Sequence, residues 1–234
     1  MNTLGEATLH AFQLLFTGDA GLWEIVAISF SVSLRAVLIA TPPAFVLAFV
    51  LAYGFFPGRR VLISVFHALL ALPAVVVGLL LYILLSRSGP LGEWKLLFTQ
   101  WAMVAGQIAL SFPILVAFGH AAIAAGDRRA WETASTLGAS PARAMLTLMF
   151  EVRFGLLAAL VAAFGRVVAE VGCSMMVGGN ILHFTRNIPT AIALETSKGS
   201  FAQGIALGMV LMALALGLNF AVAMLRGGRG GAVV

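Results

Sequence analysis

The sequence predicts an all-α membrane protein with five transmembrane helices. Of its 234 residues, 61% are hydrophobic and only 10% are charged, and the mean hydropathy is +1.04. This composition is too apolar for a water-soluble domain of the same length. None of the apolar stretches alternates as the strands of a membrane barrel do. The five that reach the roughly 20 residues needed to cross a bilayer are Ile25–Leu51, Val61–Leu85, Trp101–Ala125, Phe154–Val177 and Phe201–Leu225.

Residues 1–23 are expected to form an interfacial segment ahead of the first span. The stretch Leu4–Phe16 carries apolar residues at helical spacing but is too short to cross a bilayer. We expect this helix to lie in the membrane interface, with contact to a partner protein as an alternative role. Gly18 and Asp19 end it before Trp23, which is the kind of residue that anchors a span at the interface.

Basic residues predict the orientation of the bundle, because Lys and Arg accumulate in loops on the cytoplasmic side. The side that carries the long polar stretch 127–153 has Arg59, Arg60, Arg128, Arg129, Arg143, Arg153, Arg226 and Arg229, and the other side has Arg87, Lys95, Arg186 and Lys198. We therefore expect the N-terminus outside and the C-terminus, with a short tail at 226–234, in the cytoplasm. These loop residues account for the pI near 10.4 without a nucleic-acid partner.

The polar stretch joins the third and fourth spans and is expected to form two short helices beside the membrane. Asp127 can cap the first helix, Gly138 ends or bends it, and Ser140-Pro141 can start the second. From the residues alone, a solvated loop and a docking surface are both open. Small side chains that would let a partner approach closely are Thr133, Ala134 and Ser135.

The same stretch resembles the coupling loop of ABC importer permeases, E-A-A-x(3)-G-x(9)-I-x-L-P. Glu132-Thr133-Ala134, Gly138 and Leu148 stand at the spacing of that motif. The sequence departs from it at Thr133, Leu148, Phe150 and Glu151. The resemblance implies that residues 24–225 form an ABC transporter transmembrane domain with its coupling loop at 127–153. The residues implied to dock into a cytoplasmic ATPase subunit are Glu132, Thr133, Ala134, Gly138 and Ala139.

Two further segments, Ser86–Leu97 and Gly165–Phe201, resemble the oxyanion branch of these permeases, which carries tungstate, molybdate and sulfate. The run Val177-Gly178-Gly179-Asn180, followed by Thr185-Arg186, is most similar to tungstate permeases. The resemblance implies a type I importer fold and ATP-driven import of tungstate by alternating access, with molybdate or sulfate as the alternative substrates. It also implies the cytoplasmic (inner) membrane of a bacterium or archaeon, a cytoplasmic ABC ATPase dimer and an extracytoplasmic oxyanion-binding protein. Five helices are few for a gated path, so we expect a homodimer.

The chain itself is not expected to be an enzyme or to hold a cofactor or metal. It has no G-x-x-x-x-G-K-[ST] phosphate loop, and its two lysines, Lys95 and Lys198, fall on the predicted outer side. ATP and Mg²⁺ would therefore be bound by the partner ATPase. An ATP-independent anion channel would have no use for a coupling loop. An intramembrane enzyme would need paired carboxylates or metal ligands at membrane depth, where Glu170 stands alone.

Charged and flexible residues within the spans are the candidates for the translocation path. A charge at mid-membrane costs roughly 2.5–3.5 kcal/mol on insertion scales, so it should face protein or water. Arg166 precedes Glu170 by one helical turn, which predicts a shared helix face, either as a structural ion pair or as a polar stripe for the anion. Arg35 either extends to the interface or contacts the anion. The run Gly178-Gly179-Asn180 either simply ends span four or offers backbone N–H groups to the anion.

Overall fold

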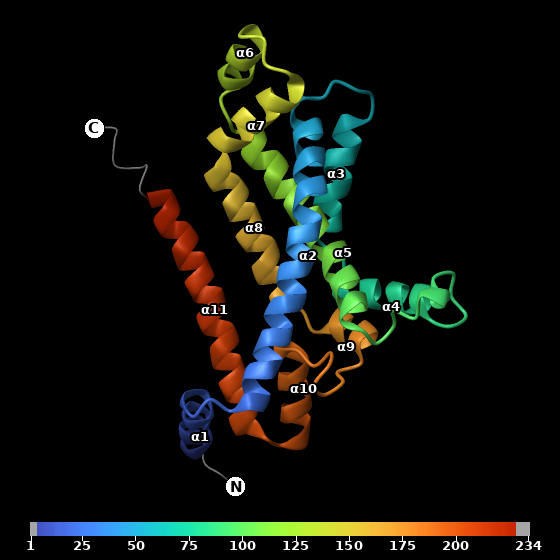
Figure 1. The fold of residues 1–234 in the computed structure, drawn as a ribbon, viewed down its shortest axis with the longest axis vertical. Coiled ribbons are helices and arrows are strands. Elements are labelled where there is room, and N and C mark those ends of the chain that lie inside the picture. Colours follow the sequence, from blue (N-terminus) through green and yellow to red (C-terminus); the bar gives the residue numbers. More distant parts are fainter. Residues whose placement is uncertain (1–3, 228–234) are drawn as a thin grey trace.

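The computed structural model describes residues 4–227, and these residues form helices without any strand (Figure 1). The first three residues of the expected interfacial segment lie outside the described part, as does the tail from 228 onward with Arg229. The helices are α1 (Leu4–Phe16), α2 (Ala20–Tyr53), α3 (Arg59–Leu69), α4 (Ala74–Leu85), a 3-10 turn (Gly92–Trp94), α5 (Gln100–Ala124), α6 (Arg128–Thr136), α7 (Pro141–Glu151), α8 (Arg153–Val168), α9 (Gly172–Gly178), α10 (Ile188–Lys198) and α11 (Phe201–Gly227).

Three of the described helices are long and apolar enough to cross a membrane as single helices: α2, α5 and a length of α11. They correspond to the first, third and fifth predicted spans, and α2 extends beyond the prediction at both ends. Five spans are reached if two bent pairs, α3 with α4 and α7 with α8, each count as one.

The second predicted span, Val61–Leu85, is not one helix. It breaks between α3 and α4, and the two parts meet at an angle of 99°. The break follows from Pro73, which has no N–H to donate and becomes the N-cap of α4. Short-range bonds close α3, because the amides of Leu70 and Ala71 bond the carbonyls of His67 and Ala68. As a result α4 projects sideways from the bundle (Figure 1).

The fourth predicted span, Phe154–Val177, is also wrong as a single helix. α8 ends at Val168 and the chain turns before α9 begins at Gly172. At its other end α8 meets α7 at an angle of 76°, with Val152 as the joint between them. The stretch is hydrophobic throughout, so hydropathy does not reveal the break between α8 and α9. Only the polar groups around the break indicate it.

The core of the bundle is built on close contact between α2 and α5. Four alanines at every fourth position of α2 are at most 1% exposed: Ala36, Ala40, Ala44 and Ala48. On α5, a Cβ added to Gly119 would lie 3.3 Å from the Cβ of Ala48. Small residues of this kind let helix backbones approach closely in lipid, where packing replaces the hydrophobic drive.

The two ends of the bundle carry different elements. α6 and α7 lie at one end, and α1 and α10 lie at the other (Figure 1). Helix α1 covers Leu4–Phe16, and its Ala11 is fully buried in a cluster with Leu22 of α2 and Leu207 of α11. Its Leu9 and Phe16 are exposed. Its placement in a membrane interface stays a prediction.

We expect Gly78→Ala to destabilise the fold, because the added Cβ would lie 2.8 Å from the backbone Cα of Cys173. Overpacking of this kind costs about 1–3 kcal/mol, and α4 and α9 would have to separate to relieve it. The measurement is the thermal unfolding midpoint of the detergent-solubilised chain. Gly217→Ala is the matched control, since nothing lies within 4 Å of a Cβ added there. Equal midpoints for the two variants would contradict the packing at Gly78.

Candidate functional site

The first candidate site is the α6–α7 hairpin, residues 127–151. Asp127 caps α6 by accepting a hydrogen bond from the amide of Arg129 at 2.9 Å. Gly138 turns the chain with a φ of +81°, a conformation that L side chains rarely adopt. Ser140 is the N-cap of α7 and Pro141 occupies its first turn. The helix–glycine–helix arrangement predicted from the sequence is therefore present.

An aromatic contact that the sequence analysis missed holds α6 against the bundle. The indole of Trp131 lies 5.3 Å from the ring of Phe49 and 5.4 Å from the ring of Tyr53, measured between ring centroids. Both partners belong to the last turns of α2. Aromatic pairs at this distance contribute beyond the area they bury. Trp131 stands next to Glu132 in the sequence, but nothing in the motif indicates which way it points.

The opposite side of α6 is open. Glu132 and Thr133 are exposed, and Glu132 makes no hydrogen bond or ion pair with any described residue. Leu137, just before the glycine, is 82% exposed. Ala134 and Ala139 are half-buried, and the amide of Ala139 bonds the carbonyl of Ala134 across the turn. The hairpin thus presents small, polar and apolar side chains that nothing in the described chain covers.

The hairpin continues directly into the membrane helix α8. Leu148 is fully buried beside Ile123 and Leu156, so α7 is fixed to the bundle by its last turns. Val152 ends α7 and starts α8, and its amide bonds the carbonyl of Leu148. The sharp bend is made here without the proline of the family motif, where this chain has Glu151.

The second candidate site surrounds the break after α8. Glu170 is only 3% exposed, and its carboxylate accepts hydrogen bonds from the amides of Cys173 at 2.7 Å and Ser174 at 3.0 Å. Arg166 is exposed and makes no ion pair with a described residue. The predicted pairing of Arg166 with Glu170 is wrong, because α8 ends between the two residues and the helical spacing no longer applies. Glu170 instead caps α9.

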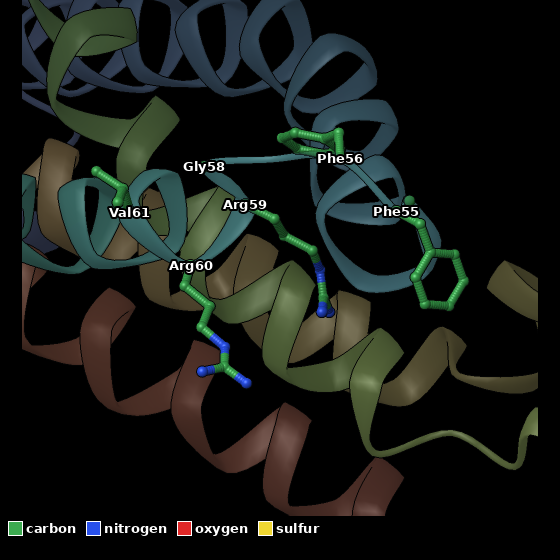
Figure 2. A pocket seen from close by; sticks show the side chains of 7 residues that line it. Phe55, Phe56, Gly58, Arg59, Arg60 and Val61 are labelled. Atoms are coloured by element: carbon green, nitrogen blue, oxygen red, sulfur yellow. The ribbon is translucent and has the colours of Figure 1, made fainter.

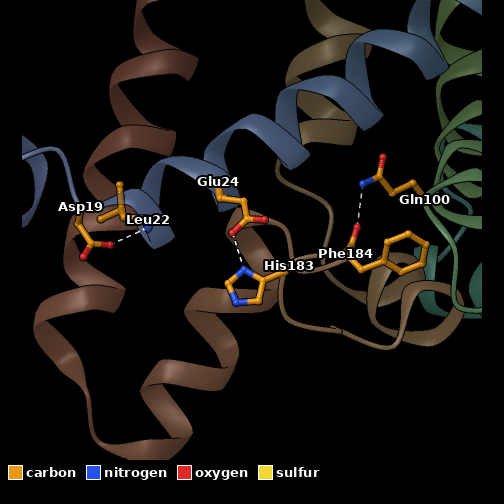
Figure 3. Close-up of polar contacts among 6 residues, drawn as sticks. All are labelled: Asp19, Leu22, Glu24, Gln100, His183 and Phe184. Carbon is orange, nitrogen blue, oxygen red and sulfur yellow. Dashed lines mark hydrogen bonds and ion pairs between the residues drawn. The ribbon is translucent and has the colours of Figure 1, made fainter.

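Arg35 holds neighbouring elements together. Its guanidinium donates to the carbonyl and the hydroxyl of Ser31, both at 2.9 Å, and to the side-chain oxygen of Gln100. It also lies 5.6 Å from the ring centroid of Trp101, within the range of a cation–π contact. The amide nitrogen of Gln100 donates in turn to the carbonyl of Phe184 at 2.8 Å (Figure 3). Gln100, which the sequence analysis did not single out, therefore joins α2 to residues 179–187, the α9–α10 loop.

The glycines that end α9 are tightly packed. A Cβ added to Gly178 would lie 2.8 Å from the sulfur of Met103, and the amide of Gly179 is already bonded to the carbonyl of Met175. The Thr185 hydroxyl donates to the carbonyl of Gly178 at 2.6 Å. These contacts show that Gly178-Gly179-Asn180 ends α9. The Gly179 amide is already bonded and is not free for an anion.

Two polar groups of the α9–α10 loop remain unpaired. The side-chain oxygen of Asn180 and the Nε of Arg186 are buried without a hydrogen-bond partner. On the exposed face of the loop, Nδ1 of His183 lies 2.6 Å from a carboxylate oxygen of Glu24 in α2 (Figure 3). No group of three or more His, Cys, Asp or Glu side chains within the described residues could hold a metal ion.

Comparison with known proteins places this architecture. No family model matches the chain. The tungstate uptake system permease protein TupB of Campylobacter jejuni is 40% identical over 211 residues, which cover 90% of this chain and 88% of that protein. The chain belongs to the ABC transporter permease family, in its oxyanion branch. The permease is also 39% identical to a probable anion ABC transporter permease of Haloferax volcanii, over 85% of this chain and 88% of that one. The molybdenum permease ModB of Escherichia coli is 33% identical over 83% of this chain and 89% of its own.

Solved structures show the same fold at low sequence identity. The permease matches an amino acid ABC transporter with a TM-score of 0.63 and 16% identity, covering 92% of this chain and 96% of that one. It matches the MetNI methionine ABC transporter with a TM-score of 0.64 and 16% identity, covering 91% and 96% of the two chains. The predicted fold class, an all-α permease of the ABC importer kind, is confirmed.

We expect Gln100→Leu to loosen the α9–α10 loop, because it removes the bonds to both Arg35 and Phe184. The measurement is amide hydrogen exchange of a peptide that covers residues 179–187, which should exchange faster than in the unaltered permease. Gln100→Glu separates the two bonds, since it keeps an acceptor for Arg35 and loses the donor to Phe184. Unchanged exchange in both variants would show that Gln100 does not hold the loop.

Proposed function

We propose that this permease forms the membrane path of an ATP-driven importer for an oxyanion, with tungstate as its substrate. The observation that supports this most is the 40% identity to a tungstate permease across 90% of the chain. A second tungstate permease, from Peptoclostridium acidaminophilum, is 33% identical over 94% of this chain. Molybdate and sulfate are the alternative substrates, because their permeases match at 33% and 28% identity or below.

The α6–α7 hairpin is the proposed contact with the ATPase. Its uncovered side carries the exposed Glu132, Thr133 and Gly138, with Ala134 and Ala139 half-buried at the turn. Trp131 anchors the other side on α2. A partner seated there would push on α2 through the aromatic contact and on α8 through the joint at Val152. We propose that a cytoplasmic ABC ATPase dimer, which binds ATP and Mg²⁺, docks on this surface.

The remaining parts of the assembly are also proposals. Two copies of the chain would frame one path, with the hairpin in the cytoplasm and an extracytoplasmic binding protein delivering the oxyanion to the α1–α10 end. The α2–α3 turn lies at the same end of the bundle as α6, and α3 begins there with Arg59 and Arg60, as the charge count requires (Figure 1). That arrangement supports the predicted orientation, with the N-terminus outside and the C-terminus inside.

Within the path, the contacts favour some candidate residues over others. The polar groups of Arg35 and Glu170 are already bonded inside the chain, so we assign them to holding its shape. Arg166 is exposed, and the Asn180 side chain has a buried oxygen without a partner. Rotating that amide would present its NH₂ group, which is a donor an oxyanion can use. Gly179, with a φ of +70°, would act by letting the backbone turn before Asn180, and Gly178 by leaving room for Met103.

We expect deletion of this chain to abolish tungsten uptake at low external tungstate, and the intact chain to restore it. Intracellular tungsten, molybdenum and sulfur, measured by elemental mass spectrometry in source cells, decide the substrate. Loss of molybdenum or sulfate uptake with normal tungsten would move the proposal to that substrate. Normal uptake of all three oxyanions would contradict it.

We expect the double variant Glu132→Ala with Gly138→Val to lose the ATPase, because a β-branched residue is strained at a φ of +81°. The measurement is co-purification of the ATPase with the tagged permease. Arg87→Gln, in the turn after α4, is the matched control, since that side chain is exposed and away from the hairpin. Undiminished capture by the double variant would contradict docking at α6.

A further inference from the structure

A basic hollow lies at the turn between α2 and α3, outside both candidate sites. It measures about 380 Å³ and is lined by residues of the turn and the start of α3 (Figure 2). A second hollow of about 320 Å³ adjoins it and shares Gly54, Phe55 and Arg59. None of the lining residues of either hollow carries a carboxylate. The site is therefore positively charged on its own.

The two arginines of the hollow differ in how they are held. Arg59 donates to the carbonyls of Leu51 and Ala52 at the end of α2, which fixes its guanidinium beside the turn. Arg60 is exposed and makes no hydrogen bond or ion pair with a described residue. Both side chains extend to the same side of the turn (Figure 2). A fixed and a free guanidinium that line one hollow suit a phosphate group, which accepts several hydrogen bonds at once.

Apolar surface continues from this charged site along α3. Phe55, which lines the hollow, is 90% exposed. On α3 itself no residue is buried, and Val61, Leu62 and Val65 are 65%, 40% and 43% exposed. With 11 residues, α3 is about 16 Å long, close to one leaflet of a hydrocarbon core that is about 30 Å thick.

We propose that this hollow binds an anionic phospholipid from the leaflet on the α6 side. The lipid phosphate contacts Arg59 and Arg60, and an acyl chain lies along the exposed face of α3. A free oxyanion would contact the arginines alone, whereas a phospholipid also contacts Phe55 and the apolar face of α3, so the structure favours the lipid. Basic pockets beside membrane helices are known to recognise anionic headgroups. The proposal does not rest on the transported substrate, and the site adjoins the ATPase contact through Tyr53, which lines the second hollow and packs on Trp131.

The test uses native mass spectrometry of the full chain in mild detergent with added palmitoyl-oleoyl phosphatidylglycerol, compared with phosphatidylcholine of the same chains. We expect bound phosphatidylglycerol to survive at lower lipid concentration than phosphatidylcholine. Arg60→Gln should weaken phosphatidylglycerol binding about fivefold without unfolding the chain, because its side chain is exposed. Phe55→Ala should weaken the same binding several-fold. Arg87→Gln is the matched control and should leave it unchanged.

Three outcomes would overturn the proposal. Arg60→Gln and Arg87→Gln could weaken phosphatidylglycerol binding equally, which would show only a general attraction to charge. Inorganic phosphate could displace the lipid while Phe55→Ala has no effect, which would assign the hollow to a soluble anion. The spectra also report the number of subunits. If phosphatidylglycerol binding that depends on Arg60 were seen on monomers but not on dimers, a second copy of the chain would cover this face.

Discussion

The close approach of α2 and α5 is the contact on which the rest of the structure depends. In lipid, helices gain little from burying apolar surface, so contact between small residues has to supply the attraction. The buried alanines from Ala36 to Ala48 of α2 and Gly119 of α5 provide it. Once these two helices are fixed, α8 packs beside them through Ala159 and Ala163, and the α6–α7 hairpin is brought to the end of α2.

The second constraint is that every backbone group freed by a helix break must find a partner where water is absent. Side chains supply that partner at the break between α8 and α9 and at the start of α10, whereas backbone bonds close α3 and α7. Gln107 donates to the carbonyl of Val167 where α8 ends, and Glu170 accepts from the first amides of α9. Ser29 accepts from the amide of Ile188 at the start of α10. The breaks are therefore stable features of the fold.

The sequence predicted the helical class, the places of α2, α5 and α11, and the caps of the hairpin, because these depend on local hydropathy and on single capping residues. It did not predict the breaks in the second and fourth spans. Hydropathy continues across Pro73 and across Ala169, and a proline inside a membrane helix is often tolerated. Gln107 and Gln100 donate hydrogen bonds to residues that lie 60 and 84 positions away in the sequence, respectively. A pattern read along one chain cannot show such partners. Arg166 was paired with Glu170 because the end of α8 between them was not predicted.

The joint at Val152 and the Trp131 contact together close a ring of elements around the bundle. One arm runs from α6 through α2 to Glu24 and Arg35, which hold the α9–α10 loop through His183 and Gln100. The other runs from α7 through α8 and α9 to Gly178, which Thr185 of the same loop bonds. The ring has four parts: two long ones, α2 and α8 with α9, and two short ones, the hairpin and the α9–α10 loop. While these contacts persist, a tilt of α8 against α2 at one end of the bundle is geometrically tied to a change in the loop at the other.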